Sequence, residues 1–210
     1  MEEKKISSAV IKRLPRYYRY LSELLEKGID RISSHELSKK MNVTASQIRQ
    51  DFNNFGGFGQ QGYGYNVSYL HDEIGKILGL EHNYNVIIIG AGNLGQALAN
   101  YGGFTKRGFQ MAGIFDIDPE KIGKKINDIP VYSIDEIETF VKEHPVHIAA
   151  LTVPKDQASR IAGRLAEVGV EAFCNFASTD LKVPSHVVVE NVHLAESLMR
   201  LSYRLSEKDK

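Results

Sequence analysis

The spacing of apolar residues changes near residue 85. Before this point apolar positions recur at the three- and four-residue intervals of amphipathic helices, and after it short apolar runs alternate with helical patterns. The candidate strands are 86–89, 111–116, 131–132, 146–152, 171–175 and 187–189, and the candidate helices are 94–102, 119–125, 134–143, 156–168 and 194–206. This alternation is typical of an α/β fold with helices on both faces of a parallel sheet. We expect a Rossmann-like, doubly wound sheet with the strand order 3-2-1-4-5-6.

The first helical pattern carries a cluster of basic side chains. Its apolar positions are Val10, Leu14, Tyr17, Tyr18, Leu21, Leu24 and Leu25, and it ends near Gly28. Pro15 marks either a kink or a fresh helix start. The basic residues are Lys12, Arg13, Arg16 and Arg19, of which the three arginines are candidate DNA contacts. A solvated basic face is the alternative that the sequence leaves open.

Two short helices separated by a tight turn follow. Ser33 and Glu36 have the spacing of a capping box, and Thr44-Ala45-Ser46-Gln47 is a second one. Two capped helices joined in this way form a helix-turn-helix, whose second helix enters the major groove of DNA. On that helix, Ile48, Phe52 and Phe55 fall at i, i+4 and i+7 and face the core. The residues left facing outward are Ser46, Gln47, Arg49, Gln50 and Asn53.

The outward set includes residue types that read bases. An arginine fork matches guanine O6 and N7, whereas a glutamine amide matches adenine N6 and N7. The alternative is an ordinary polar helix surface. We favour base reading because the caps, the turn and the outward polar set occur together.

A glycine-rich segment comes next, with five glycines between Gly56 and Gly64. Residues 57–62 match Gly-x-Gly-x-x-Gly, but they follow a helical pattern and lead into a poor helix start. We therefore expect a β-hairpin wing here rather than a phosphate loop. The candidate DNA contacts of the wing are Gln60 and Gln61 at its tip, and Tyr65. Residues 67–80 supply a closing helix.

A second Gly-x-Gly-x-x-Gly lies between the apolar run 86–89 and a helix-forming segment. In this setting the three glycines permit a tight turn, a close approach to a pyrophosphate, and close packing of helix on strand. The negative charge of the ligand then meets N–H groups at the helix N-terminus. The predicted loop residues are Gly90, Ala91, Gly92, Asn93, Leu94 and Gly95.

An acidic residue follows at the expected distance. About 20 residues after the loop, the apolar run 111–115 ends in Asp116. A carboxylate there accepts hydrogen bonds from a ribose 2′-OH and repels a 2′-phosphate, so it favours NAD over NADP. The alternative is that Asp116 only caps the next helix, with Asp118-Pro119 as the rival cap.

Two further segments follow predicted strands. Thr152, Val153 and Pro154 come just after the fourth strand, and Asn175 and Phe176 come after the fifth. Ligands of open α/β sheets bind outside the carboxyl ends of the strands, where the strand order reverses. We expect the first segment beside the ligand and the second near its nicotinamide end.

Composition narrows the class of protein. The apolar fraction of 42% and charged fraction of 25% are ordinary for a globular chain, and no run reaches the roughly 18 apolar residues of a membrane span. A single cysteine, Cys174, excludes an internal disulfide and multi-cysteine metal sites, and the N-terminus lacks a signal-peptide pattern. We expect a cytoplasmic protein with no metal and no membrane partner.

The net charge of zero conceals an asymmetry. Residues 1–50 hold 11 Lys and Arg against 6 Asp and Glu, a balance of +5, and the remainder holds 15 against 20, a balance of −5. A basic head on an acidic body is consistent with nucleic-acid binding. We expect a winged-helix DNA-binding domain at 1–80, a linker at 81–85, a Rossmann domain at 86–192 and a terminal helical segment at 193–210.

The last helix repeats Leu194, Leu198, Leu201 and Leu205. This apolar stripe packs either on its own domain or on a second subunit, and the residues alone do not decide between the two. A helix-turn-helix usually works as a dimer on a palindrome, which makes a homodimer an open possibility here.

The motifs together resemble the Rex family of bacterial redox-sensing transcriptional repressors, over essentially the whole chain. The matching segments are 47–52, 55–56, 62–67, 90–95, 101–104, 115–119 and 175–177. The resemblance implies a winged-helix head, a Rossmann body and a homodimer that exchanges its terminal helix. It also implies an operator of double-stranded DNA, which such proteins bind when NADH is scarce and release when NADH accumulates, with NADH and NAD⁺ as effectors.

The resemblance also implies a redox-dependent latch, formed in similar proteins by a tyrosine, an aspartate and an arginine. The tyrosine and arginine fall on Tyr101 and Arg19. The aspartate position falls on His193, which is a departure because the two residues differ in charge. A second departure is Gln50, where many relatives carry Lys or Arg.

The leading hypothesis is an NADH-responsive repressor that is not an enzyme. The alternative from another class is an NAD-dependent dehydrogenase or a CoA-binding enzyme with a basic accessory domain. An enzyme needs an acid, a base or a hydride acceptor beside the nicotinamide. The seven histidines are scattered, and the sequence shows no Ser/Tyr-x-x-x-Lys pair placed to serve such a site.

Overall fold

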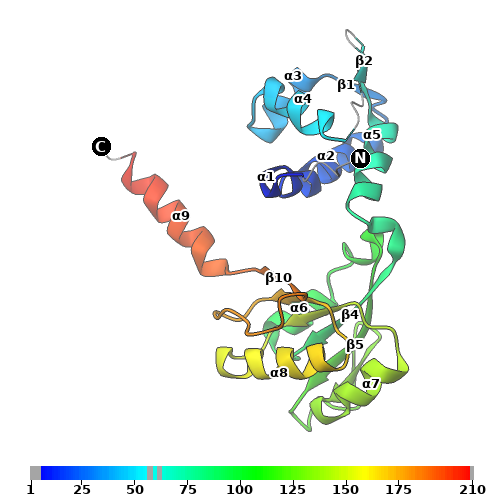
Figure 1. The fold of residues 1–210 in the computed structure, drawn as a ribbon, viewed down its shortest axis with the longest axis vertical. Coiled ribbons are helices and arrows are strands. Elements are labelled where there is room, and N and C mark those ends of the chain that lie inside the picture. The colour runs from blue at the N-terminus through cyan, green and yellow to red at the C-terminus, as the bar shows by residue number, and fades with distance from the viewer. Residues whose placement is uncertain (1–5, 56–58, 61–62, 209–210) are drawn as a thin grey trace. The chain divides into compact units, whose positions relative to one another are not determined.

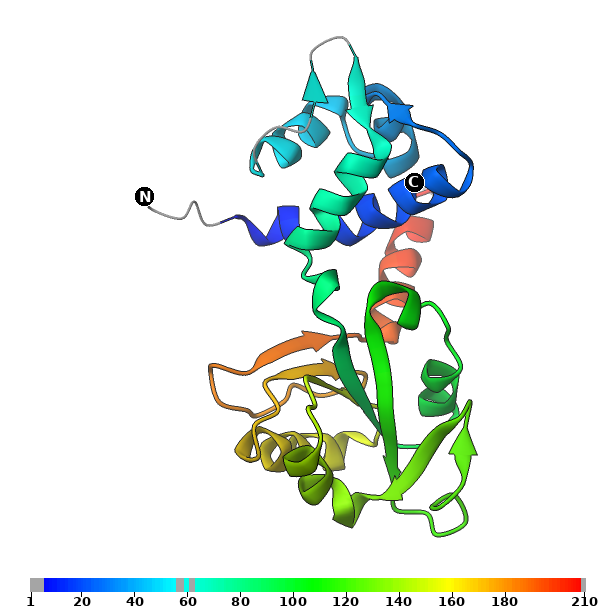
Figure 2. The same ribbon diagram turned by 90° about the vertical axis from the view of Figure 1, so that its right-hand side faces the viewer.

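The computed structural model describes residues 6–55, 59–60 and 63–208. It divides the chain into two compact units, Met1–His82 and Asn83–Lys210. Figures 1 and 2 show the helices and strands of each unit.

Helices α1 (Ser8–Ile11) and α2 (Leu14–Glu26) open the first unit. Pro15 lies in the first turn of α2, so it starts a new helix rather than kinking one. The apolar face of α2 buries Leu14, Tyr17 and Leu21. The Tyr17 ring meets the ring of Phe52 edge-on, with centroids 5.0 Å apart, and this pair lies in the core of the unit.

The helix-turn-helix consists of α3 (Ser34–Met41) and α4 (Ala45–Asn53). Ser33 and Glu36 form the predicted capping box in full. At α4 only half of the second box forms, because Thr44 accepts from the Gln47 amide while the Gln47 side chain bonds elsewhere. Asn42 makes the turn in the left-handed region at φ 53°.

A small sheet and one helix complete the unit. Strands β1 (Arg31–Ile32), β2 (Gly59–Gln60) and β3 (Gly64–Asn66) lie in the order β1-β3-β2, and both pairings are antiparallel. The predicted hairpin is therefore present. Position 64 requires glycine for two reasons: its φ is +71°, and a Cβ there would lie 2.8 Å from the Ile32 carbonyl oxygen. Asn66 then caps α5 (Val67–Ile77), which packs on α2.

The second unit is built on a seven-stranded sheet. Its strands are β4 (Tyr84–Ile89), β5 (Phe109–Asp116), β6 (Lys125–Ile126), β7 (Ile129–Ser133), β8 (Ile148–Leu151), β9 (Ala172–Asn175) and β10 (Val188–Asn191). The order is β10-β9-β8-β4-β5-β7-β6, with every pair parallel except β6–β7. Without β6 this is the predicted order 3-2-1-4-5-6.

The helices cover both faces of this sheet. Helix α6 (Asn93–Ala99) lies on one side, and α7 (Ile137–Glu143) and α8 (Lys155–Glu167) lie on the other (Figure 2). Residues of β4 alternate between the two cores: Ile87 and Ile89 join the α7/α8 side, and Val86 and Ile88 join the α6 side. Three short 3-10 helices, Leu80–His82, Thr105–Arg107 and Ile134–Glu136, lie between these elements.

The predicted helix at 119–125 is wrong. Residues 119–123 form turns, because Gly123 adopts φ +82° and its N–H donates to the Val131 carbonyl. The chain then enters the hairpin β6–β7, whose two-residue turn has Asn127 and Asp128 at positive φ. Polar turn residues, not an amphipathic helix, therefore connect β5 to β7.

Other predicted boundaries also move. Helix α6 ends at Ala99 instead of residue 102. The expected linker 81–85 is ordered: a 3-10 helix ends at His82, and β4 begins at Tyr84, whose ring stacks on Phe109 with centroids 6.0 Å apart. The sheet therefore begins within the segment that the polar sequence indicated as a loop.

Helix α9 (Leu194–Ser206) has the predicted bounds. None of its residues, all of which the structure describes, is buried. The exposed large apolar side chains are Leu194, Leu198, Met199, Leu201, Tyr203 and Leu205. The helix therefore does not cover its apolar stripe on its own domain.

Candidate functional sites

The outward face of α4 is available to a partner. Ser46, Arg49, Gln50 and Asn53 are exposed. The Arg49 Nη1 donates to Ser34 Oγ at 3.0 Å, which steadies the guanidinium and leaves other N–H groups free. Asn54 Nδ2 donates to the Gln50 backbone carbonyl at 3.0 Å, and the Gln50 side chain has no hydrogen bond within the described residues.

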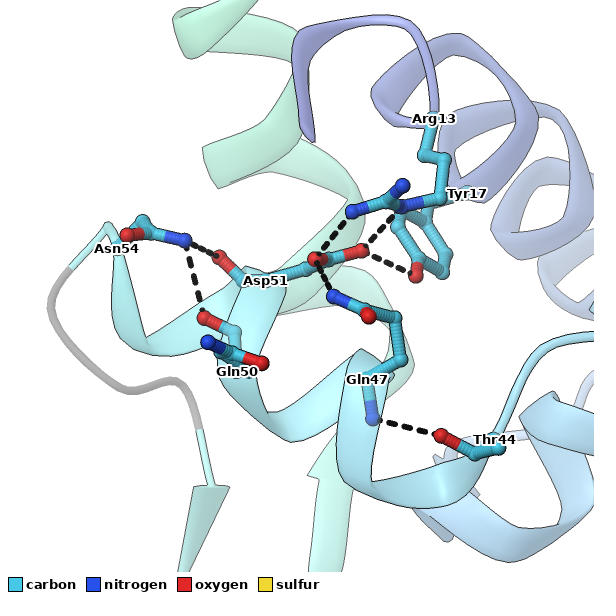
Figure 3. A network of polar contacts seen from close by, with 7 residues as sticks. All are labelled: Arg13, Tyr17, Thr44, Gln47, Gln50, Asp51 and Asn54. Atoms are coloured by element: carbon cyan, nitrogen blue, oxygen red, sulfur yellow. Dashed lines mark hydrogen bonds and ion pairs between the residues drawn. The ribbon is translucent and has the colours of Figure 1, made fainter. Parts of the chain in front are cut away.

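The inner face of α4 carries a buried carboxylate that sequence reasoning missed. Asp51 is fully buried and accepts four hydrogen bonds (Figure 3). Arg13 donates through Nε and Nη2, each at 2.7 Å. The Tyr17 hydroxyl donates at 2.8 Å, and Gln47 Nε2 donates to Oδ1 at 2.8 Å. The cluster ties α4 to the start of α2.

These contacts decide the charge state of the cluster. Burial alone would raise the pKa of Asp51, but the hydrogen bonds from Arg13, Gln47 and Tyr17 outweigh burial and lower that pKa. Burial, and then the hydrogen bond to Asp51, raise the pKa of Tyr17. Asp51 is therefore an anion and Tyr17 a neutral donor.

The cluster restricts two candidate DNA contacts. Arg13 donates to Asp51 through Nε and Nη2, and Gln47 donates through Nε2, so these groups are not available to DNA. The Gln47 Oε1 has no partner among the described residues. Asp51 lies three residues after Ile48, on the inward face of α4, which the sequence predicted to be apolar. An acidic residue at a core-facing position, together with an arginine on a neighbouring helix, could have indicated the buried ion pair.

The other basic candidates on α2 are exposed. Arg16 Nη2 donates to the Met41 carbonyl at 2.9 Å and so bridges α2 to the end of α3. Arg19 lies over the ring of Tyr20, 5.7 Å from its centroid. Both keep donors free on the surface.

The wing predictions divide. Tyr65 does not face a ligand: it is buried, and its ring meets Phe52 edge-on with centroids 5.1 Å apart. Burial raises the pKa of Tyr65. Gln60 belongs to β2, and Gln61 lies outside the described residues. Tyr65 therefore supports the wing from its inner side.

The glycine loop after β4 has three glycines with different surroundings. Gly90 adopts φ +100°, and a Cβ there would lie 2.9 Å from the Thr152 carbonyl oxygen. A Cβ at Gly95 would collide with the Gly90 carbonyl oxygen. Around Gly92 no described atom lies within 4 Å of such a Cβ. The space beside Gly92 is where the backbone can be approached from outside.

The remaining loop residues are arranged around these glycines. Ala91 is buried, Asn93 is exposed, and Leu94 is half-buried at the start of α6. Thr152 supports the loop from β8, because its Oγ1 donates to the Ile89 and Gly90 carbonyls, each at 2.9 Å. The loop is therefore fixed by the chain itself.

Asp116 lies against this loop. Its Oδ2 accepts from the Ala91 amide at 2.5 Å, and its Oδ1 accepts from the Asp118 amide at 2.9 Å. Lys121 Nζ lies 3.7 Å from Oδ2 and 3.2 Å from Asp118 Oδ2. Asp116 therefore caps a turn rather than a helix, and both of its oxygens keep a further acceptor position.

A cavity of about 820 Å³ opens at the carboxyl ends of the strands. Its lining includes Gly90, Gly92 and Asp116, and Thr152, Val153 and Pro154 lie on the β8 side. Lys121, Gln157 and Arg160, which the motifs did not indicate, also line it. The cavity is large enough for a nucleotide-sized ligand.

Asn175 and Phe176 are placed differently. Asn175 is fully buried: its Nδ2 donates to the Thr179 carbonyl and Asn191 Oδ1, and its Oδ1 accepts from the Ala177 amide. Phe176 packs against the α6-side core. Neither residue lines the cavity. Asn175 thus joins the ends of β9 and β10.

Two of the three latch candidates, Tyr101 and His193, belong to the second unit. Tyr101 follows α6, is exposed, and meets the ring of Phe104 at 4.9 Å between centroids. His193 precedes α9, and its Nδ1 lies 2.9 Å from Glu196 Oε1. Its Nε2 is buried and has no partner among the described residues.

The described residues contain no group of three or more His, Cys, Asp or Glu that would hold a metal ion. None of the helices in that part of the chain is long and apolar enough to cross a membrane.

Comparisons with known proteins match both units. A family described as the putative DNA-binding protein N-terminus matches residues 5–53, and the CoA binding domain family matches residues 81–179. The redox-sensing transcriptional repressor Rex of Thermoanaerobacter pseudethanolicus is 58% identical over 205 residues, which are 98% of this chain and 92% of that relative.

Two solved structures are similar over nearly the whole chain. One is RSP in complex with beta-NAD+ and operator DNA, with a TM-score of 0.91 and 58% identity over 97% of this chain and 94% of that chain. The other is RSP in complex with beta-NADH, with a TM-score of 0.90 and 54% identity over 98% and 97% of the two chains. RSP is a Rex-family repressor.

Proposed function

Because the chain belongs to the Rex family of redox-sensing transcriptional repressors, we propose that it binds operator DNA and that NADH and NAD⁺ compete for its second unit. The single observation that carries this is the pairing of an exposed helix-turn-helix face with a glycine loop at a nucleotide-sized cavity. The family consists of repressors, and the nucleotide acts as an effector rather than as a substrate.

We assign DNA binding to residues 1–80 and base reading to the second helix of the helix-turn-helix. Its exposed residues Ser46, Arg49, Gln50 and Asn53 face away from the core, as a groove-reading surface must. Arg16 and Arg19 keep free donors that suit phosphates. Arg13 is withdrawn from this set, because Asp51 binds it.

We assign nucleotide binding to residues 86–192. The open side of Gly92 accommodates a pyrophosphate at the start of α6. Asp116 retains acceptor positions for a ribose hydroxyl, and Thr152, Val153 and Pro154 line the same cavity. Asn175 acts indirectly, by holding the strand ends beside the site.

We infer that residues 193–210 form a homodimer interface. The Leu194, Leu198, Leu201 and Leu205 stripe is exposed along one side of α9, and water-exposed apolar area of this extent favours a partner. A second copy presents the same stripe, and an inverted-repeat operator matches a two-fold dimer. A DNA-binding regulator of this kind works in the cytoplasm.

The switch requires that the two nucleotides stabilise different states. A ligand shifts such an equilibrium only by its differential affinity for the two states, so NADH must favour the DNA-released state. We assign Tyr101 and His193 to this step. Tyr101 follows α6, the helix that begins at the glycine loop, and His193 precedes α9, the helix assigned to the dimer interface.

A gel-shift titration tests the proposal. Operator duplexes are selected from a random pool with the parent protein, and the complex is titrated with NADH, with NAD⁺ at equal concentration as the matched control. We expect NADH to release the DNA and NAD⁺ to leave it bound. Equal retention with both nucleotides, or no selected duplex, would contradict the proposed function.

A further inference from the structure

The amide of Gln47 has a fixed orientation. Its nitrogen lies 2.8 Å from Asp51 Oδ1. An ionised carboxylate only accepts hydrogen bonds, so the group facing it must be the NH₂ and not the carbonyl. The two ends of this glutamine are therefore assigned by chemistry, and its oxygen is the end turned away from Asp51.

The anchor of this amide is itself immobile. Asp51 is fully buried and holds two bonds from Arg13 and one from Tyr17 in addition to the bond from Gln47. Flipping the amide would place its carbonyl oxygen against that carboxylate, leaving two acceptors face to face in a buried position. The flipped orientation is therefore disfavoured as long as the Asp51 hydrogen bonds are formed.

The position of Gln47 is one that a groove-reading helix uses. Gln47 lies in the first turn of α4, where its own backbone N–H is capped by Thr44. The first turn of the second helix is the part that approaches base edges. Its Oε1 has no hydrogen-bond partner in the described part of the chain and is free to accept one.

Gln50 offers a direct contrast on the same helix. Its side chain is exposed and carries no hydrogen bond within the described residues. Figure 3 shows the Gln47 side chain turned back toward Asp51, whereas the Gln50 side chain makes no contact with the other residues of the network. Gln50 can therefore extend both ends of its amide to an adenine, whereas Gln47 keeps its nitrogen at Asp51.

We propose that Gln47 reads the operator through its carbonyl oxygen alone, with Asp51 as the positioning residue. This inference deepens the proposed function and rests on it. In the major groove the partners of a lone acceptor are the exocyclic amines, N6 of adenine and N4 of cytosine. The keto groups of guanine and thymine meet the oxygen as a second acceptor and are rejected.

The proposal differs from ordinary glutamine recognition in one respect. A two-point glutamine contact uses both N6 and N7 of adenine. The Gln47 contact uses N6 only, so N7 at that base is irrelevant to it. The base it selects is A or C, not A alone.

The experiment compares base preference in the parent and in Gln47→Ala. All four bases are placed in turn at each position of the half-site of a selected operator. We expect one position at which the parent prefers A or C by about five-fold per half-site and Gln47→Ala has no such preference. Gln47→Ala leaves Asp51, Arg13 and Tyr17 in place, so amide-exchange protection of α4 should stay unchanged.

Modified bases then separate one-point from two-point contact. At the Gln47-dependent position, adenine is replaced by purine, which lacks the N6 amine, or by 7-deazaadenine, which lacks N7; a selected cytosine is replaced by 2-pyrimidinone. Removing the amine should weaken parent binding to the Gln47→Ala level, and removing N7 should not. Gln50→Ala is the matched comparison. At the adenine that Gln50 reads, removing either N6 or N7 should weaken parent binding, and neither change should weaken binding of Gln50→Ala further.

Asp51→Asn supplies the positioning test. This variant removes the charge that orients the amide, so the A/C preference should fall while NADH affinity stays at the parent value. If Asp51→Asn does not fold, the Gln47→Ala and modified-base results still decide.

Several results would overturn the proposal. They are a Gln47-dependent loss on removing N7 equal to that on removing the amine, an unchanged base profile in Gln47→Ala, or an unchanged A/C preference in a folded Asp51→Asn. A parent protein that selects no duplex would instead overturn the proposed function, so the two failures are distinguishable.

Discussion

The two units fix their candidate sites by different means. In the first, Arg13 and Tyr17 at the start of α2 and Gln47 of α4 all donate to Asp51, and the bonds from Arg13 and Tyr17 hold α4 against α2. In the second, the backbone makes the site: Gly95 packs against the Gly90 carbonyl, and the loop needs no side chain at those positions. One site therefore depends on a charge and the other on the absence of side chains.

The largest effect should come from removing the charge. Asp51→Ala leaves the Arg13 guanidinium and the Tyr17 hydroxyl without their acceptor, and breaking such a pair costs several kcal/mol when it is fully buried. Arg13 is partly exposed, so we expect a loss of about 3 kcal/mol in the free energy of unfolding of the first unit. Hydrogen exchange of α4 amides measures it.

The control for this variant lies outside the cluster. Gln50→Ala removes an exposed side chain of the same helix and should change α4 protection by less than about 0.5 kcal/mol. Similar losses in both variants would show that α4 is sensitive to any substitution, and that Asp51 does not specifically hold α4 in place.

The backbone site should respond to added methyl groups according to position. Gly95→Ala forces a Cβ into the Gly90 carbonyl oxygen, and overpacking of this kind costs about 2 kcal/mol. Gly92→Ala meets open space and should leave the unit stable while weakening NADH binding. Thermal unfolding and NADH titration of the two variants test this. Unaltered NADH affinity in Gly92→Ala would contradict the proposed position of the pyrophosphate beside Gly92.

The same contrast explains how much the sequence could predict. The capping box at Ser33 and the bounds of α9 depend on local period and on residues a few positions apart, and both were correct. The strand order was also correct, because the alternation of strands and helices indicated a doubly wound sheet, whose usual order is known. The wing was distinguished from a phosphate loop by its flanking pattern, and the hairpin of β2 and β3 is present.

The errors involve contacts over longer distances or unusual turns. Arg13 and Asp51 lie 38 residues apart, and neither residue type nor helical period showed that they pair. Helix 119–125 failed because a glycine at φ +82° ends a pattern that looks amphipathic. The glycine spacing indicated the nucleotide loop, but it did not show that Asn175 is consumed by structural hydrogen bonds.

Asp116 contacts the glycine loop through its side chain, so its removal tests how far the second site depends on backbone alone. Asp116→Ala should lower NADH affinity about ten-fold and reduce the preference over NADPH, because a hydrogen bond to a charged acceptor contributes roughly 1.5 kcal/mol. Lys121 Nζ, 3.7 Å from Asp116 Oδ2, would then keep only its pair with Asp118 and could attract a 2′-phosphate. Competition titrations with both nucleotides measure the change.

The opposite result for Asp116 is also informative. If the unmodified protein binds NADH and NADPH equally, the ion pairs of Lys121 already offset the carboxylate, and Asp116 serves only to cap Ala91 and Asp118. The second unit would then rely on its backbone alone.

The smallest effect concerns acid. The hydrogen bonds of Arg13, Gln47 and Tyr17 lower the pKa of Asp51 despite its burial, so folding favours the ionised form. A depressed pKa contributes stability that is present above the unfolded value of about 4 and is lost as pH falls through the folded value. The stability difference between the parent and Asp51→Asn should therefore shrink in acid. Denaturant titrations of both proteins from pH 7 to pH 3 measure it, and a difference independent of pH would mean that hydrogen bonding, not charge, makes Asp51 the anchor of α4.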